Sequence, residues 1–414
     1  MYKVTRESGL SKILLPQYFW YGKSPLPLFF PDKWKLFICE MEGDRLPTLE
    51  KGEIKEIINR PIGTERIEVL AKDKKEVAII VDDISRPTEA SLILPYVLES
   101  LYKADVNDES IRILISLGSH GAQTAEDFRK KLGDKIVERY SVYNHNCYEN
   151  CIEIGKTRSG LNVKINEELM KCDLKIGIGA ILPHLYTGYS GGGKLFLPGL
   201  AHIDTIDGFH SFMTPDKKGI LDHDNPMICE IEDALSIIGV DFLINILVNT
   251  KGDIIGAFAG DPQEVYREGV REAEKVYKTR NYDDLDCVVS NAHLKVNEGD
   301  IALLAGINLL KDKGGTCILV MNSPSGQITH YLMRNFGKFI GGRQAVKRVR
   351  LPENINTIVY SQFMDRTTFD PYENQERIVW EKDWQRIINL TQDYHGKDSL
   401  EVGIIPDGTI QYVC

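Results

Sequence analysis

The chain has 414 residues, of which 43% are apolar and 27% are charged, and its formal net charge is −10. A chain of this length is too long for one ordinary hydrophobic core and predicts two domains. The acidic balance argues against a nucleic-acid-binding or membrane-surface protein, because neither partner attracts a protein of net negative charge.

The chain ends and the cysteines predict a cytoplasmic protein. Neither end has the basic and then apolar pattern of a signal peptide, and no apolar run reaches the roughly 18 residues that a membrane span needs. The eight cysteines form no C-x-x-C pair. Cys147 and Cys151 lie near His145, but these three residues do not complete a tetrahedral zinc site, so we expect reduced thiols.

A strand–helix rhythm begins at residue 76, after a proline-interrupted stretch over residues 1–70 that predicts strands and loops. Strands are expected over residues 76–83, 111–120 and 174–184, and helices over residues 89–104 and 124–133. Each strand ends in polar residues, and open α/β sheets bind their ligands at this end. We therefore expect one crevice to collect four side chains: Asp83, Arg86, His120 and His184.

The α/β pattern continues and divides the chain into two domains. The expected elements are a helix over 226–240, strands over 241–249 and 253–262, a charged helix over 263–280, strands over 284–293, 316–324 and 354–363, and helices over 301–315 and 380–396. The fold class is thus α/β, with two Rossmann-like domains whose mostly parallel sheets face a central cleft. We expect a cofactor-binding and catalytic domain over residues 1–272 and a smaller α/β domain over residues 273–414, whose last strand could return to the first domain.

The most informative stretch runs from Leu174 to His210. A buried strand leads to Pro183 and His184, and a glycine-rich segment follows, with Lys194 directly after it. Its glycines can aim several backbone N–H groups at an anion; they are Gly188, Gly191, Gly192 and Gly193. This combination predicts a site for a phosphate-bearing cofactor.

The same stretch imitates a nucleotide triphosphatase loop, since Gly188 to Lys194 fits the G-x-x-x-x-G-K spacing. A true loop of that kind continues with Ser or Thr and a helix. Here Leu195 follows, and Pro198 and Gly199 come soon after. Triphosphate hydrolysis is therefore not expected.

The residues PHLYTGYSGGGKLFLPG from Pro183, followed by GFH at residues 208–210, resemble the lactate racemase family that uses a nickel-pincer nucleotide. Three further segments share this resemblance: VDDISRPT at 81–88, LGSHG at 117–121 and HDNPMICEIEDA at 223–234. The four motifs occur in the family's order and spacing, and the resemblance covers most of residues 80–262.

The resemblance implies a racemase or epimerase that inverts the C2 centre of a 2-hydroxy acid. The α-hydrogen of such an acid is too weakly acidic for a side-chain base to remove at low cost, and reversible hydride transfer to a cofactor avoids the carbanion. A base is needed near the hydroxyl in either orientation, and histidine has a suitable pKa. His120 and His184 match the family's acid/base pair.

The resemblance also implies the cofactor, Ni(II) pyridinium-3,5-bisthiocarboxylic acid mononucleotide. Lys194 matches the lysine to which this nickel-pincer nucleotide is covalently attached. His210 matches the imidazole that completes the square plane of Ni(II). The expected partners are a small 2-hydroxy acid and the cofactor-biosynthesis enzymes that mature the protein.

Other residues receive supporting roles by the same resemblance. Arg86 would hold the substrate carboxylate through its planar fork of donors, and Asp83 would orient either a histidine or the cofactor ribose. The backbone amides of Gly191, Gly192 and Gly193 would approach the cofactor. Three histidines match no catalytic position and are expected to be structural: His202, His223 and His330.

The second domain departs from the family pattern. Members carry a Tyr-Gln pair and a Lys after its first strand, and these residues hold the substrate carboxylate. The matching positions around Ile301 to Ala305 are apolar here, and Lys295, His293 or Asn297 could substitute. We assign substrate binding to Lys295 and do not assume that lactate is the substrate.

Two functions of other classes also fit part of the pattern. A zinc- or nickel-dependent hydrolase would use His184 and His210 directly as metal ligands, although the sequence lacks H-E-x-x-H or another complete ligand set. A non-catalytic nucleotide-binding homologue would keep the fold and lose the chemistry. Such a protein would not need the two titratable bases His120 and His184.

Overall fold

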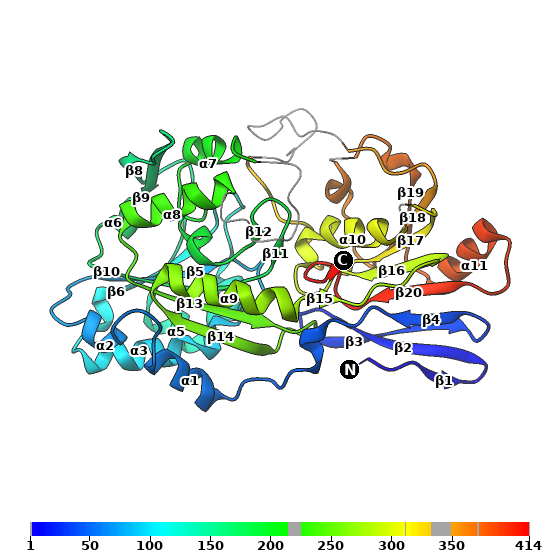
Figure 1. The fold of residues 1–414 in the computed structure, drawn as a ribbon, viewed down its shortest axis with the longest axis horizontal. Helices are drawn as coiled ribbons and strands as arrows, with labels where there is room; N and C mark the ends of the chain where they lie inside the picture. The colour runs from blue at the N-terminus through cyan, green and yellow to red at the C-terminus, as the bar shows by residue number, and fades with distance from the viewer. Residues whose placement is uncertain (1, 214–224, 311, 333–348, 371, 414) are drawn as a thin grey trace.

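The computed structural model describes residues 2–213, 225–310, 312–332, 349–370 and 372–413. Two α/β units lie side by side, each built on a six-stranded sheet (Figure 1). The prediction of an α/β protein with two mostly parallel sheets is confirmed. None of the described helices combines the length and the apolar character needed to cross a membrane.

The first sheet has the strand order β14-β13-β10-β5-β6-β7. Only its edge pair, β13 and β14, is antiparallel. The strands are β5 (Val77–Asp82), β6 (Ile111–Ser116), β7 (Ser141–Asn144), β10 (Leu174–Ala180), β13 (Phe242–Val248) and β14 (Ile254–Gly260). Every residue of β5, β10 and β13 is buried, as expected for strands that are covered by helices on both faces.

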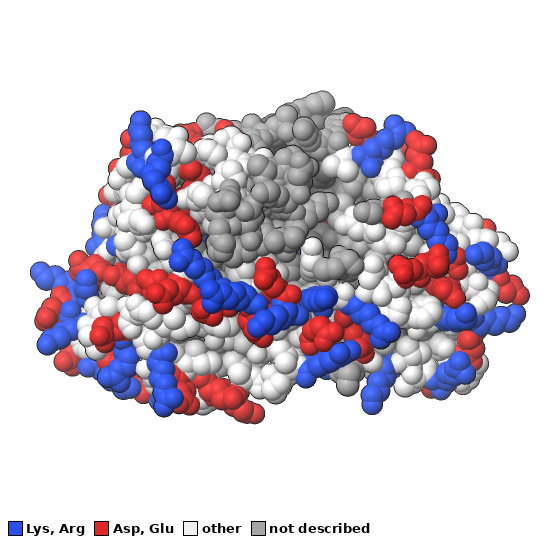
Figure 2. Space-filling view, in the orientation of Figure 1, with Lys and Arg blue, Asp and Glu red and all other residues white. Residues whose placement is uncertain are grey.

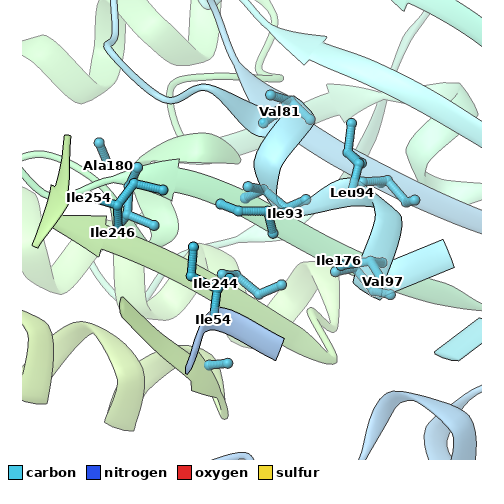
Figure 3. Close-up of a cluster of buried hydrophobic side chains, with 14 of the residues drawn as sticks. Ile54, Val81, Ile93, Leu94, Val97, Ile176, Ala180, Ile244, Ile246 and Ile254 are labelled. Atoms are coloured by element: carbon cyan, nitrogen blue, oxygen red, sulfur yellow. The ribbon is translucent and has the colours of Figure 1, made fainter. Parts of the chain in front are cut away.

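The two faces of this sheet pack against different helices. Helices α1, α3 and α9 cover one face, where Ile54 and Val97 meet Ile176 and Ile244 in a continuous apolar cluster (Figure 3). Helices α6, α7 and α8 cover the other face. The helices of this unit are α1 (Lys51–Asn59), α2 (Ile67–Leu70), α3 (Leu94–Lys103), α4 (Ala125–Leu132), α5 (Asp134–Arg139), α6 (Glu167–Met170), α7 (Ile203–His210), α8 (Pro226–Ile238) and α9 (Pro262–Val276).

The outer surface of α9 is highly charged, as its sequence predicts. Its basic residues form ion pairs with acidic neighbours, for example Arg271 with Glu268 and Lys275 with Glu272. Basic and acidic side chains accordingly alternate across this face of the protein (Figure 2). The apolar side of α9 contributes Val270 and Ala273 to the core.

The second sheet is parallel throughout, in the order β19-β18-β17-β16-β20-β4. Its strands are β4 (Lys35–Ile38), β16 (Cys287–Asn291), β17 (Gly315–Val320), β18 (Ile355–Tyr360), β19 (Ile378–Glu381) and β20 (Glu401–Ile405). Helices α10 (Asp300–Leu310) and α11 (Trp384–His395) pack on it. The smaller pairs and hairpins are β1 (Thr5–Glu7) with β2 (Leu10–Gln17) and β3 (Ser24–Pro31), β8 (Cys151–Lys156) with β9 (Asn162–Asn166), β11 (Pro183–His184) with β12 (Gly188–Tyr189), and β15 (Lys278–Thr279) with β21 (Tyr412–Val413).

Part of the N-terminal segment, which the predicted division places in the first domain, contacts the second sheet. Strand β4 pairs with β20 in the second sheet, and Leu15 and Leu28 of the β2–β3 hairpin pack against Val289 and Ile404 of that sheet. Strand β4 and the β2–β3 hairpin therefore pack with the C-terminal unit, although they come first in the chain. Phe19 and Trp20, between β2 and β3, and Met41, after β4, already contribute to the core of the first unit.

The two units also meet above the first sheet. The loop after β6 forms a short antiparallel bridge with residues 329–331, in which His120 faces His330. Gly121 N donates to Thr329 O at 3.0 Å, and Tyr331 N donates to Ser119 O at 2.7 Å. This bridge fixes the position of His120 relative to the second unit.

Candidate active site

A cavity lies at the carboxyl ends of β5, β6 and β10, on the side facing the second unit. It brings together the four side chains that were expected to converge and adds others from both units. Its ionisable lining residues are Asp82, Asp83, Arg86, His120, His184, Tyr186, Lys194, His210, Glu298 and His330.

Asp83 orients His120. The ring nitrogen Nδ1 of His120 donates to Asp83 Oδ2 at 2.5 Å, and the other oxygen of Asp83 accepts from Ser85 N at 2.9 Å. Burial opposes the charged carboxylate, but the nearby His120 and Arg86 outweigh it and hold the pKa of Asp83 below its usual value. Because Nδ1 carries the proton, Nε2 of neutral His120 presents its lone pair as a base.

A fully buried lysine holds the loop that carries Asp83 and Arg86. Lys131 Nζ lies 2.6 Å from Asp82 Oδ1 and donates to Asp83 O at 2.6 Å and to Arg86 O at 2.8 Å. The second oxygen of Asp82 accepts from Thr88 Oγ1 at 2.6 Å. One ammonium group thus forms an ion pair with Asp82 and two hydrogen bonds to the loop that follows.

Arg86 reaches across to the second unit. Its Nη1 donates to Glu298 Oε2 at 2.8 Å, and the same oxygen lies 2.7 Å from Lys295 Nζ. All three side chains are largely shielded from solvent, with exposed fractions of 18% or less. A buried carboxylate of this kind requires such partners to offset its desolvation.

Lys194 and His184 form the second polar pair of the cavity. Lys194 Nζ lies 3.0 Å from His184 Nε2, and His184 Nδ1 accepts from the backbone N–H groups of Tyr186 and Thr187 at 3.2 and 3.4 Å. Burial and the charges of Arg86 and Lys295 hold the pKa of Lys194 well below its usual value. Burial and the neighbouring Lys194 likewise lower the pKa of His184. These contacts fit an imidazole that is protonated on Nε2 and donates to a neutral amine.

His210 ends α7 and faces the same cavity. Its Nδ1 donates to the carbonyl oxygen of Ile206, one turn earlier, at 2.7 Å. This bond leaves the lone pair of Nε2 free, which is the usual arrangement for a metal-binding histidine. Burial lowers the pKa of His210 to about 4, so the ring is neutral near pH 7.

Comparisons with known proteins point to one family. A family model described as the lactate racemase N-terminal domain matches residues 21–220. A lactate racemase from Thermoanaerobacterium thermosaccharolyticum is 28% identical over 368 residues, which cover 86% of this chain and 83% of the relative. A lactate racemase from Lactiplantibacillus plantarum is 29% identical over 67% of each chain. The chain is therefore similar to lactate racemases over most of its length, and its first half matches their N-terminal domain.

Solved structures agree with this assignment at the level of the fold. The apoprotein structure of the lactate racemase from Thermoanaerobacterium thermosaccharolyticum has a TM-score of 0.72 at 22% identity, with 97% of this chain and all of that chain covered. A crystal structure of a Thermotoga maritima protein has a TM-score of 0.63 at 18% identity, with 91% and 100% covered. The similarity to named lactate racemases over most of the chain supports an isomerase.

The family's glycine motif has a packing role at two of its positions. Gly191 has a φ of 80° and lines the cavity, where a side chain would meet Ala180 O. Gly192 and Gly193 do not line this cavity, so their predicted backbone contacts with the cofactor stay a prediction. The Gly192 amide donates to Asn245 Oδ1 at 3.0 Å, and side chains at the two positions would clash with α9 and α8.

Other predicted residues are placed as follows. Lys295 lies 2.7 Å from Glu298 and does not line the cavity, and its assignment to substrate binding stays a prediction. His202 caps α7, where its Nδ1 accepts from Asp204 N, in agreement with a structural role. His330 lines the cavity against expectation, and His223 lies outside the described residues.

The hydrolase alternative lacks support in the described part of the chain. No group of three or more His, Cys, Asp or Glu side chains is placed there to bind a metal ion. His210 offers one nitrogen to the cavity, whereas Nδ1 of His184 is used by backbone amides and Nε2 contacts Lys194. The arrangement fits a metal that brings most of its own ligands.

Proposed function

We propose that the protein inverts the C2 centre of a 2-hydroxy acid by reversible hydride transfer, using a nickel-pincer nucleotide attached to Lys194. The observation that carries this proposal is the contact between Lys194 and His184. Burial and the charges of Arg86 and Lys295 lower the pKa of this amine well below its usual value, so its nucleophilic neutral form is more populated near pH 7 than that of a solvated lysine. A solvated structural lysine would be protonated under these conditions.

The residues at this site fit the cofactor in two respects. Lys194 offers an amine for covalent attachment, and His210 offers an imidazole nitrogen for nickel. Both side chains line one cavity, as a single cofactor requires. When bound, this cofactor would supply an electrophilic carbon that accepts and returns the hydride.

His120 and His184 suit the two proton-transfer roles because they are protonated on different nitrogens. His120 carries its proton on Nδ1, toward Asp83, and offers Nε2 as a base to a substrate hydroxyl. His184 carries its proton on Nε2 and can donate a hydrogen bond there; to act as the acid it must hold a second proton, because neutral imidazole does not release its only N–H proton near pH 7. Attachment at Lys194 would use the amine lone pair that His184 contacts and so release Nε2 for the substrate. The two roles exchange in the reverse direction.

Arg86 is suited to bind the substrate carboxylate. Among the described residues, its guanidinium is hydrogen-bonded only through Nη1, to Ser85 and Glu298. The Nη2 and Nε groups remain available for a carboxylate. The Asp83 carboxylate already accepts a hydrogen bond from His120, so in this scheme it orients that histidine and does not bind the cofactor ribose.

The proposal is tested by the intact mass of protein from a cofactor-producing host. We expect an adduct of several hundred daltons that Lys194→Ala abolishes. Lys164→Ala serves as the control, because Lys164 lies on β9, outside the cavity, and pairs with Asp204. An unmodified wild-type mass in a preparation that racemises a 2-hydroxy acid would refute covalent attachment.

A further inference from the structure

Glu298 is an acidic side chain that the second unit places in the proposed active site. It ends the short helical turn Val296–Glu298, which follows β16 and precedes α10. Its carboxylate lines the cavity together with Arg86, His120 and His184. In the sequence, Glu298 is marked only by Lys295, three residues earlier, and this spacing indicates an ordinary local ion pair.

The two carboxylate oxygens of Glu298 have different surroundings. Oε2 is shared by Arg86 Nη1 at 2.8 Å and Lys295 Nζ at 2.7 Å. Oε1 lies 3.9 Å from His120 Nε2, which is too far for a hydrogen bond. Within the described ranges, Oε1 has no hydrogen-bond donor of its own, so the two cations fix the side chain while one oxygen keeps its acceptor capacity.

This acceptor lies where a substrate must bind if His120 acts on the C2 hydroxyl. A substrate that places a methyl group beside Oε1 would exclude solvent from this oxygen and offer it no hydrogen bond. Such binding is unfavourable, because burying an unsatisfied charged acceptor costs free energy. A substrate with a hydroxyl group there would restore the bond. Sites built to hydrogen-bond a substrate hydroxyl discriminate strongly against analogues that lack it.

We infer that Glu298 contacts the substrate and selects 2-hydroxy acids that carry at least one further hydroxyl group beyond C2, the polyhydroxylated carboxylates. The inference rests on the proposed function and specifies its substrate class. Arg86 would hold the carboxylate through Nη2 and Nε, while Oε1 of Glu298 would accept from the additional hydroxyl. Lys295 is then a positioning residue that acts through Glu298.

Glycerate and lactate form a matched pair of probes, because they differ by one hydroxyl group on C3. The cofactor-loaded enzyme and Glu298→Gln, Glu298→Leu and Lys295→Met variants would be assayed for kcat/KM with each acid. Calorimetric binding of both acids to the cofactor-free protein gives a second readout that does not require turnover. Circular dichroism and thermal unfolding verify that each variant is folded.

We expect the wild-type protein to prefer glycerate over lactate by about tenfold to a hundredfold. Glu298→Gln keeps an acceptor oxygen and should retain part of this preference, whereas Glu298→Leu should bring the ratio close to one. Lys295→Met should reduce the ratio without removing it. A ratio near one in the wild type, or one that Glu298→Leu leaves unchanged, would overturn the inference.

The outcomes separate this inference from the proposed function. If the loaded enzyme racemises 2-hydroxy acids without preferring those with additional hydroxyl groups, only the assignment of Glu298 fails. If the adduct on Lys194 is present but no 2-hydroxy acid is racemised, the proposed function fails, and the substrate assignment fails with it.

Discussion

Lys194 Nζ and His184 Nε2 lie 3.0 Å apart in a buried pocket, close to the positive charges of Arg86 and Lys295. Burial, together with these two cations, lowers the pKa of Lys194 well below its usual value and so favours the neutral amine. His184 meets this amine with an N–H group because backbone amides occupy its other nitrogen. The same contacts therefore keep the lysine nucleophilic and hold the histidine in one tautomer.

The neutral state of Lys194 can be measured in the cofactor-free protein by carbamylation with cyanate, which attacks neutral amines. Ordinary exposed lysines react about tenfold more slowly for each pH unit below their pKa. Lys194 should lose less reactivity than the exposed lysines between about pH 9 and about pH 7, because its pKa is lowered well below the usual value. Peptide mass spectrometry gives both rates in one sample, and parallel pH profiles would contradict a neutral Lys194.

Asp83 should make stability dependent on acidity. The pKa of Asp83 is lower in the folded protein than in the unfolded chain, where it is about 3.9. The ionised carboxylate therefore stabilises the folded protein fully above the unfolded-state pKa. This stabilisation is lost as the pH falls through the lower folded-state pKa. Asp83→Asn should reduce the free energy of unfolding by roughly 1–3 kcal/mol near pH 7. Denaturant titrations of both proteins should show this difference shrinking below about pH 4. A difference that is constant with pH would show that ionisation of Asp83 is not involved.

Lys131 is expected to couple stability to activity. Lys131→Met leaves the buried Asp82 carboxylate without its cation and should cost about 3–5 kcal/mol. Activity should fall as well, because Lys131 also holds the carbonyl groups of Asp83 and Arg86. The double variant Lys131→Met/Asp82→Asn should lose less stability than the two single variants added together. Strict additivity in denaturant unfolding would argue against the ion pair.

Replacement of His210 should weaken nickel binding and leave the covalent attachment of the cofactor to Lys194 intact. In His210→Ala, the mass adduct on Lys194 should persist. The affinity for nickel should fall by about ten- to a hundredfold, which elemental analysis would detect as a lower content of bound nickel. His202→Ala is the matched control, since His202 lies at the start of the same helix and does not line the cavity. Equal nickel contents in both variants would remove His210 from the metal site.

Much of the first unit could be predicted from its sequence because its strands are buried on both faces. The apolar runs of β5, β10 and β13 identify them as strands, and the polar residues that follow indicate the ligand edge. The β8–β9 hairpin was not predicted, since β8 is largely exposed and lacks an apolar run. The place of β4 could not be foreseen, because its partner β20 is more than 360 residues away in the chain.

The site was predictable where one loop or motif carries the signal. His184, Lys194 and His210 lie within one stretch, and Asp83 with His120 follow neighbouring strands. Glu298 was missed because its contact with Arg86 spans 212 positions and depends on how the two units meet. His330 was missed for the same reason, as its bridge to His120 exists only in the assembled fold. Local spacing contains no information on such contacts.

Hydride transfer is tested most directly with a 2-hydroxy acid that carries deuterium on C2. The cofactor-loaded enzyme would racemise this acid in ordinary water, and mass spectrometry would measure the label in the product of opposite configuration. The proposed function predicts that deuterium is largely retained, because the hydrogen leaves C2 and returns as one hydride. Replacement of deuterium by solvent hydrogen at the rate of racemisation would show proton abstraction and contradict the account.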